Sequence, residues 1–252
     1  MKNRSFIFTA VVASLLYVSC TKPQTTLSEN ERPFNPPIMG WSSWNAFLVD
    51  ISEDIIKHQA DLMVEKGLKD AGYQYINVDD GYFGKRDENG VMQANEKRFP
   101  NGMKPVADHI HSLGMKAGLY TDAGTRTCGS LWNKDSIGIG AGIYGHEPQD
   151  AQLYFGDWGF DFIKIDYCGG EVLGLDEKER YTSIRNSIDK VNKNVSINIC
   201  RWAYPGTWAK DAATSWRISG DINAHWNSLK YVVGKNLYLS CLLYTSPSPR
   251  DS

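Results

Sequence analysis

Two short segments of the sequence each place a carboxylate at the end of an apolar, strand-like run. The segment FIKIDYC contains Lys164 and Asp166, and the segment WRISGDI contains Arg217 and Asp221. Because side chains alternate along a strand, the cation and the carboxylate of each segment are expected on one face. Two carboxylates on different parallel strands are the groups that hydrolysis of a glycosidic bond requires. The alternative is that both acids only cap the turns that follow their strands.

The composition is that of a globular protein with a substantial core. The chain has 252 residues, of which 42% are hydrophobic and 12% aromatic, enough for one large domain. Its 27 basic and 29 acidic residues give a formal net charge of −2, and no basic run is present. The charge pattern therefore argues against a nucleic-acid partner.

Strand-like and helix-like segments alternate through residues 36–240. Strands are predicted over residues 38–44, 73–79, 116–122, 160–166, 195–202 and 216–221. Helices with apolar residues three and four apart are predicted between them, the first with Ser52 as its N-cap. Aspartates stand at the C-terminal ends of four strands, and in a barrel all such ends face one site. We therefore predict an α/β fold, a (β/α)8 TIM barrel truncated to about six βα units.

The sequence patterns at the two ends of the chain differ from the alternating strands and helices of this domain. Residues 1–20 have a positive start and an apolar stretch too short to span a bilayer, which indicates a signal peptide. Cys20 predicts a lipoprotein signal, with an ordinary secretory signal as the alternative. Residues 21–35 are predicted to be a linker and residues 241–252 a non-native tail. We expect an exported protein, periplasmic or anchored to the outer membrane of a bacterium, in a compartment that permits disulfides.

A series of motifs gives the domain a family resemblance. They are PPIMGWSSWNAF from Pro36, GYQYINVDDG from Gly72, RFPNGM from Arg98, GLYTDAG from Gly118, GHE from Gly145, QDA from Gln149, KIDYC from Lys164 and WR with the later Asp221. In this order and spacing they resemble glycoside hydrolase family 27, the retaining α-galactosidases and their relatives. The resemblance implies a TIM barrel with an α-galactoside substrate and no cofactor.

The resemblance also assigns the catalytic pair. It implies that Asp166 is the nucleophile and Asp221 the general acid/base. Lys164 on the same face is expected to keep Asp166 ionised. A cation beside Asp221 would lower the pKa of an acid that must keep its proton, so Arg217 is expected to turn toward the 2-hydroxyl of the sugar.

The remaining site residues follow from the same resemblance. Asp79 and Asp80 would bind the 4- and 6-hydroxyls; a turn pair and a metal site are the alternatives, and no histidine stands near them at ligand spacing. Trp44 would stack on the sugar or belong to the core, and Tyr120 would lie near the nucleophile or be structural. The expected substrate-binding residues are Trp44, Asp79, Asp80, Tyr120, Lys164, Arg201, Trp202 and Arg217.

Arg201 is a departure from the family pattern. α-Galactosidases commonly have a glutamate at this position, and N-acetylgalactosaminidases have a small residue. Neither Arg201 nor the nearby Tyr204 makes room for an N-acetyl group, which favours unsubstituted galactose. The alternative is that Arg201 points outward, on the opposite face of its strand.

The cysteines complete the expected site. The resemblance implies a disulfide between Cys128 and Cys168 at the pocket wall, with two free buried thiols as the alternative. Cys200 is expected to stay free and to line the pocket.

The sequence thus predicts a retaining glycoside hydrolase that releases terminal α-galactosyl residues from oligosaccharides or polysaccharides by double displacement. An α-N-acetylgalactosaminidase or another α-glycosidase, and a non-catalytic glycan-binding surface lipoprotein, are the alternatives. The family's last two barrel strands and its C-terminal β-domain have no counterpart in these residues. We therefore expect the chain by itself to be an inactive fragment of the enzyme, and its oligomeric state stays open.

Overall fold

The computed structural model describes residues 38–237. The expected signal peptide with Cys20, the linker over residues 21–35 and the tail over residues 241–252 lie outside these residues. None of the helices within residues 38–237 is long and apolar enough to cross a lipid bilayer.

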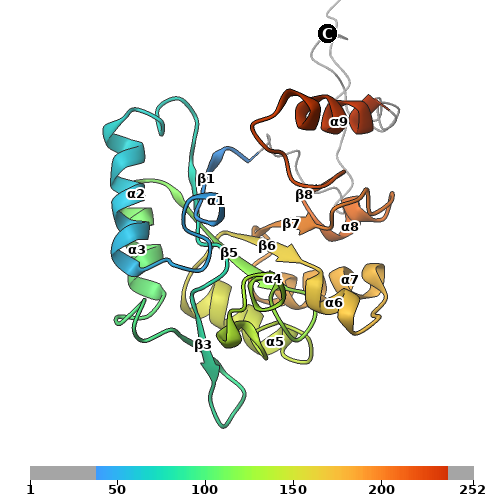
Figure 1. The fold of residues 1–252 in the computed structure, drawn as a ribbon. Helices are drawn as coiled ribbons and strands as arrows, with labels where there is room; N and C mark the ends of the chain where they lie inside the picture. Colours follow the sequence, from blue (N-terminus) through green and yellow to red (C-terminus); the bar gives the residue numbers. More distant parts are fainter. Residues whose placement is uncertain (1–37, 238–252) are drawn as a thin grey trace, which may run out of the picture. The chain divides into compact units, whose positions relative to one another are not determined.

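A six-stranded parallel sheet forms the centre of the described domain (Figure 1). Its strands follow one another in sequence order: β1 (Gly40–Ser42), β2 (Tyr75–Asn77), β5 (Lys116–Asp122), β6 (Phe162–Asp166), β7 (Ser196–Cys200) and β8 (Ser215–Trp216). The register pairs Asp122 with Asp166 and Asp166 with Cys200. Three polar side chains therefore end at the same level, at the C-terminal edge of the sheet.

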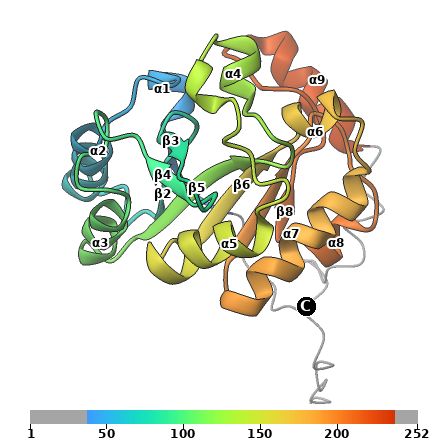
Figure 2. The ribbon, with the colours of Figure 1, turned by 90° about the horizontal axis from the view of Figure 1, so that it is seen from below.

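Helices lie around the outside of this sheet (Figure 2). The longer ones are α2 (Glu53–Glu65), α3 (Lys104–Ser112), α7 (Glu177–Val191) and α9 (Trp226–Leu237). The shorter ones are α1 (Trp44–Phe47), α4 (Cys128–Trp132), α5 (Glu147–Ala151), α6 (Cys168–Val172) and α8 (Ala209–Ala212), with a 3-10 turn at Ser136–Gly138 and a π-helix at Gln152–Asp157. As predicted, Ser52 caps α2, and its Oγ accepts a hydrogen bond of 3.3 Å from the Ile55 N–H.

The core is formed by the apolar stripes of these helices and by the sheet. Ile56 on α2, Ile110 on α3 and Ile184 on α7 are fully buried at the three-and-four spacing read from the sequence. Parallel strands that alternate with helices in sequence order are the topology of a (β/α)8 barrel. The expectation of a barrel truncated to about six units is confirmed, with β1 and β8 at the two edges of the sheet.

The sixth strand is shorter than predicted. The sequence predicted a strand over residues 216–221, but β8 ends at Trp216, and only the Arg217 N–H adds a further bond, to the Ile199 carbonyl. β8 is hydrogen-bonded to β7 on one side only within the described residues. Gly220 then weakens the extended run. Asp221 consequently lies in the loop between β8 and α9, not at the end of a strand.

One hairpin was not predicted. Strands β3 (Phe83–Arg86) and β4 (Met92–Ala94) pair antiparallel to each other, outside the main sheet. The turn between them contains Asn89 and Gly90, and Gly90 has a positive φ of 79°. An Asn-Gly pair between short strand-like runs is the signal that could have identified this hairpin.

The last predicted helix forms, but its apolar face is not covered. Trp226, Leu229 and Val233 on α9 are all exposed, whereas the sequence pattern predicted a buried stripe. Periodicity reports only that a helix has an apolar face, and burial of that face depends on the elements packed against it.

Candidate active site

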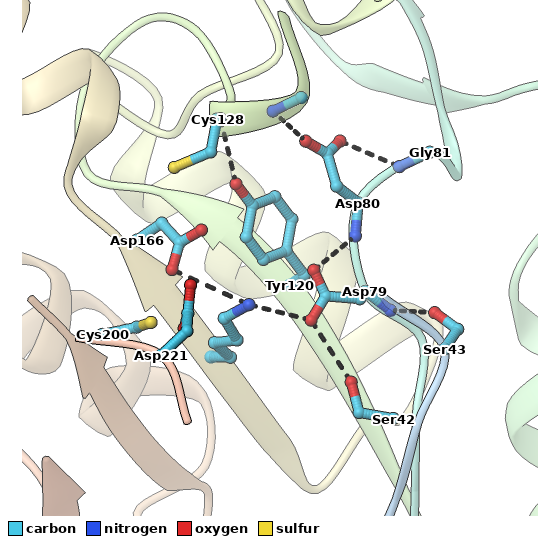
Figure 3. Close-up of polar contacts among 12 residues, drawn as sticks. Ser42, Ser43, Asp79, Asp80, Gly81, Tyr120, Cys128, Asp166, Cys200 and Asp221 are labelled. Atoms are coloured by element: carbon cyan, nitrogen blue, oxygen red, sulfur yellow. Dashed lines mark hydrogen bonds and ion pairs between the residues drawn. The ribbon is translucent and has the colours of Figure 1, made fainter. Parts of the chain in front are cut away.

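A cavity of about 410 Å³ opens at the C-terminal ends of the parallel strands. Its volume lies within the usual range for small-molecule sites. It is lined by Trp44, Asp79, Asp80, Tyr120, Cys128, Trp132, Asn133, Lys164, Asp166, Cys200, Trp202, Arg217 and Asp221. Every catalytic and substrate-binding residue expected from the sequence, with the exception of Arg201, therefore lies at one cavity. Figure 3 shows the polar groups on its walls.

Asp79 and Asp80 follow β2 and are held by backbone and side-chain donors. The Asp79 carboxylate accepts hydrogen bonds from Ser42 Oγ at 3.3 Å and from its neighbour's N–H at 2.8 Å. The Asp80 carboxylate accepts from the N–H groups of Gly81 at 2.8 Å and Gly129 at 2.9 Å (Figure 3). Both carboxylates are buried yet keep lone pairs free to accept hydroxyl donors.

The glycines beside Asp80 are required by geometry. Gly81 has a φ of 110°, a conformation that side chains disfavour. A Cβ on Gly129 would stand 2.5 Å from Asp80 Oδ2, so only glycine lets this backbone donate to the carboxylate. The loop after β2 and helix α4 are thereby joined at the cavity wall.

Lys164 lies between two carboxylates. Its Nζ is 2.9 Å from Asp79 Oδ2 and 3.8 Å from Asp166 Oδ1, and it lies 5.1 Å from the centre of the Tyr120 ring. Burial by itself would lower the pKa of Lys164, but the charges of Asp79 and Asp166 raise it above its ordinary value. The lysine is therefore a fixed positive charge at the floor of the cavity.

Asp166 ends β6 with its carboxylate deep in the cavity. Its Oδ1 is buried and accepts no hydrogen bond from the described residues. Burial raises the pKa of Asp166, while Lys164 and hydrogen bonding from Cys200 and Tyr120 act in the opposite direction. The net shift is upward, so burial outweighs the lysine that was expected to keep this group ionised. Oδ1 therefore keeps its lone pairs free of hydrogen bonds, beside the Lys164 ammonium at 3.8 Å.

Asp221 lies at the open side of the same cavity. Its side chain is 76% exposed and forms an ion pair with Arg217. Arg217 Nη1 also lies 3.7 Å from Cys200 Sγ. The sequence placed Arg217 toward the sugar and away from the acid; the structure instead pairs it with Asp221, because the loop after β8 turns the carboxylate back toward the guanidinium.

Arg201 does not line the cavity. Its guanidinium pairs with Glu171 at 3.3 Å and Glu177 at 3.4 Å and lies 5.4 Å from the Tyr167 ring centre. The expected contact with substrate is therefore replaced by the outward orientation that the sequence left open. The two glutamates, which are remote from Arg201 in sequence, account for this direction.

The cysteines lie as the family resemblance implied. Cys128 and Cys168 form a disulfide, and Cys200 is free and buried at the cavity wall. The disulfide joins the first residues of α4 and α6. Asp122, which is fully buried, accepts hydrogen bonds from Gly124 at 2.7 Å and Gly169 at 3.0 Å, so it holds the same two segments together.

The described residues contain one close group of potential metal ligands, Asp122, Cys128 and Cys168. Its two sulfur atoms are bonded to each other and cannot act as thiolates. We therefore interpret this group as a disulfide with a neighbouring carboxylate, and not as a metal site.

Two cavity-lining residues were missed by sequence reasoning. Trp132 is the last residue of the short helix α4, and Asn133 is its C-cap. The segment from Cys128 to Trp132 is too short for a helical period to be read. The one available signal was a tryptophan among small and polar residues, only four positions after the bridging cysteine.

Opening the disulfide is expected to destabilise the protein strongly. The bridge closes a loop with a sequence separation of 40, for which chain entropy predicts a loss of about 4 kcal/mol in the free energy of unfolding. Urea unfolding of the Cys128→Ala/Cys168→Ala variant would measure it. A reductant should lower the urea midpoint of the wild type and leave that of the variant unchanged; equal midpoints for both proteins without reductant would contradict the prediction.

Burial of acidic groups should make stability depend on pH. Burial raises the pKa of both Asp80 and Asp122 from 3.8 to about 7. The folded state then binds these protons more tightly than the unfolded state, so the contribution of these two groups to stability is greatest below about pH 4 and falls as the pH rises toward 7. In Asp122→Asn this fall should be smaller. Urea unfolding between about pH 4 and pH 8 tests it, and an unchanged slope would contradict the assignment.

Comparisons with known proteins agree with this arrangement. Residues 36–240 match the family model described as Alpha galactosidase A. An alpha-galactosidase A of Cellvibrio japonicus is 39% identical over 229 residues, which cover 90% of this chain and 53% of the relative. An alpha-galactosidase of Cyamopsis tetragonoloba is 42% identical over 206 residues, 81% of this chain and 47% of the relative. The chain thus spans about half the length of the curated relatives it matches.

A solved structure gives the same result for the fold. The α-galactosidase of Saccharomyces cerevisiae, solved with raffinose, superposes with a TM-score of 0.66 at 36% identity. The match covers 75% of this chain and 41% of that one.

Proposed function

The chain belongs to the Alpha galactosidase A family, and we propose that its cavity is the site of a retaining glycoside hydrolase. The reaction is the release of terminal α-galactosyl residues from oligosaccharides or polysaccharides by double displacement. The observation that carries this proposal is that Asp166 and Asp221 line one cavity, the first buried with an oxygen that accepts no hydrogen bond and the second exposed at the open side.

The two carboxylates suit different steps. Asp166 Oδ1 accepts no hydrogen bond from the described residues, so its lone pair can attack the anomeric carbon and form a glycosyl-enzyme intermediate. Asp221 has access to solvent, so it can protonate the departing oxygen and later remove a proton from water. In a retaining enzyme the two carboxyl groups are about 5–5.5 Å apart, and we expect this separation here.

The floor of the cavity supports the choice of sugar. Asp79 and Asp80 offer adjacent acceptors, which suits the neighbouring 4- and 6-hydroxyls of galactose. Lys164 Nζ holds the Asp79 carboxylate in place through its contact of 2.9 Å with Oδ2. Trp44 and Trp202, on the walls, can cover the apolar face of a pyranose.

The stereochemistry of the product tests this proposal. The complete protein that contains these residues is incubated with a panel of nitrophenyl α-glycosides, and the first product anomer is followed by proton NMR. We expect hydrolysis of the α-galactoside with α-galactose formed first, and little hydrolysis of the α-N-acetylgalactosaminide. Release of the β-anomer would show inversion, and binding without turnover would favour the glycan-binding lipoprotein.

The disulfide fits a protein exported to an oxidising compartment. We place it in the periplasm or at the outer membrane of a bacterium, anchored through a lipid on Cys20. Incorporation of labelled palmitate that is lost in Cys20→Ala would support the anchor, and labelling that persists in the variant would contradict it.

A further inference from the structure

Trp132 is an exposed tryptophan at the mouth of the cavity. Its exposed fraction is 77%, the highest among the large apolar side chains of residues 38–237, and it lines the cavity nonetheless. An indole ring that stays exposed to water does not contribute the favourable free energy that burial of its large aromatic surface would give. Single exposed apolar residues are common on protein surfaces, but Trp132 lines the opening of a ligand site, where a bound ligand can cover its ring.

The backbone around Trp132 is held rigidly. Thr127 Oγ1 caps α4 by accepting a hydrogen bond of 3.2 Å from the Ser130 N–H. Cys128 ties the first turn to α6, and the Gly129 N–H donates to Asp80 Oδ2 at 2.9 Å. The helix that carries Trp132 is therefore anchored to one of the carboxylates proposed to bind the sugar. Figure 2 shows α4 at the end of the domain where α6 also lies.

The residues that line the cavity differ in how deeply they are buried. Asp79, Asp80 and Asp166 are at most 4% exposed, and they form its floor. Asp221 and Trp132 are about three quarters exposed, and they form its rim. A galactosyl group bound at the floor must direct its glycosidic substituent toward the rim, because the leaving group has to reach both Asp221 and solvent.

The rim offers the chemistry that recognises a second sugar. The flat apolar face of an indole matches the C–H face of a pyranose ring, and the adjacent Asn133 supplies an amide that can both donate to and accept from hydroxyls. We propose that Trp132 and Asn133 form a subsite for the sugar of the leaving group, so that the site prefers galactosyl oligosaccharides to galactosides with small leaving groups. This inference rests on the proposed function.

The test compares substrates with and without a second sugar in the complete protein. Raffinose carries further sugars on its galactosyl group, and α-galactosyl fluoride carries none. In Trp132→Ala, kcat/KM for raffinose should fall about 10- to 50-fold, while kcat/KM for the fluoride should change less than about twofold. Trp132→Phe should recover part of the loss, because it keeps an aromatic face.

The matched control is Trp226→Ala, since Trp226 is 68% exposed on α9 and does not line the cavity. It should leave both substrates unaffected. An equal loss on raffinose and fluoride in Trp132→Ala, or no loss on either, would overturn the subsite. If the wild type does not hydrolyse the fluoride, the proposed function itself fails and the subsite fails with it.

Discussion

Asp166→Asn is expected to reduce turnover of every α-galactoside by about 10⁴-fold or more in the complete protein. The amide is nearly the same size as the carboxylate but cannot form the glycosyl-enzyme bond, so the loss concerns the first chemical step. Asp166 Oδ1 accepts no hydrogen bond from the described residues, so its replacement breaks no hydrogen bond at that atom and removes only the ion pair of 3.8 Å with Lys164. Steady-state rates with a nitrophenyl galactoside and with raffinose measure the effect.

A structural loss must be separated from a catalytic one. Asp54→Asn on α2 is the control, since it makes the same chemical change at a position that does not line the cavity. Its activity should match that of the wild type. The urea midpoint of Asp166→Asn should stay equal to or above that of the wild type, because the buried carboxylate carries an ionisation cost that the amide lacks. Retention of more than about one per cent of wild-type turnover would remove Asp166 from the nucleophile role.

Asp221→Asn should produce a loss that depends on the leaving group. The leaving group of a natural galactoside is a poor alkoxide that needs a proton to depart. The rate of hydrolysis of these substrates should therefore fall by about 10³-fold or more. A dinitrophenyl galactoside needs no proton for departure, so formation of the glycosyl-enzyme should be nearly unaffected. Hydrolysis of the glycosyl-enzyme by water still lacks its base, which predicts a burst of dinitrophenol followed by a slow phase. Rapid-mixing kinetics with the two substrates measure both steps.

A variant of Arg217, the ion-pair partner of Asp221, serves as the control for the Asp221→Asn prediction. Arg217→Lys keeps a cation near Asp221 but loses the planar guanidinium. It should lower the rates of both substrates by similar factors, because it changes position and not proton supply. If Asp221→Asn instead lost the burst of dinitrophenol, Asp221 would have no role as the acid of the first step.

Much of the site could be predicted because its residues stand at the ends of regular strands. Asp122 and Asp166 end β5 and β6 as the apolar runs indicate, and the parallel register brings them level with Cys200. Where a strand's pattern continues to its last hydrogen bond, the alternation of side chains decides which face the terminal residue takes. The Ser52 cap and the buried stripes of α2, α3 and α7 could be predicted for the same reason, because they depend on residues that are close together in the sequence.

Residues beyond the last regular hydrogen bond could not be placed in this way. Asp221 was assigned to a strand that ends five residues earlier, and Arg201 was assigned to the cavity although Glu171 and Glu177 draw it outward. Trp132 gave no periodic signal. For each of them, direction depends on partners that lie far away in sequence.

The sequence by itself determined the order of strands and helices, the residue types at the strand ends, and the family motifs that name the chemistry. The tertiary structure decided which of these side chains share a cavity, how deep each lies, and which charge each one meets. The physical reason is that periodicity records only the local choice between an apolar and a polar face. Depth and ion pairing are sums over neighbours from different elements, so Asp166 becomes a buried group with a raised pKa and Asp221 an exposed one paired with Arg217 only once the sheet has assembled.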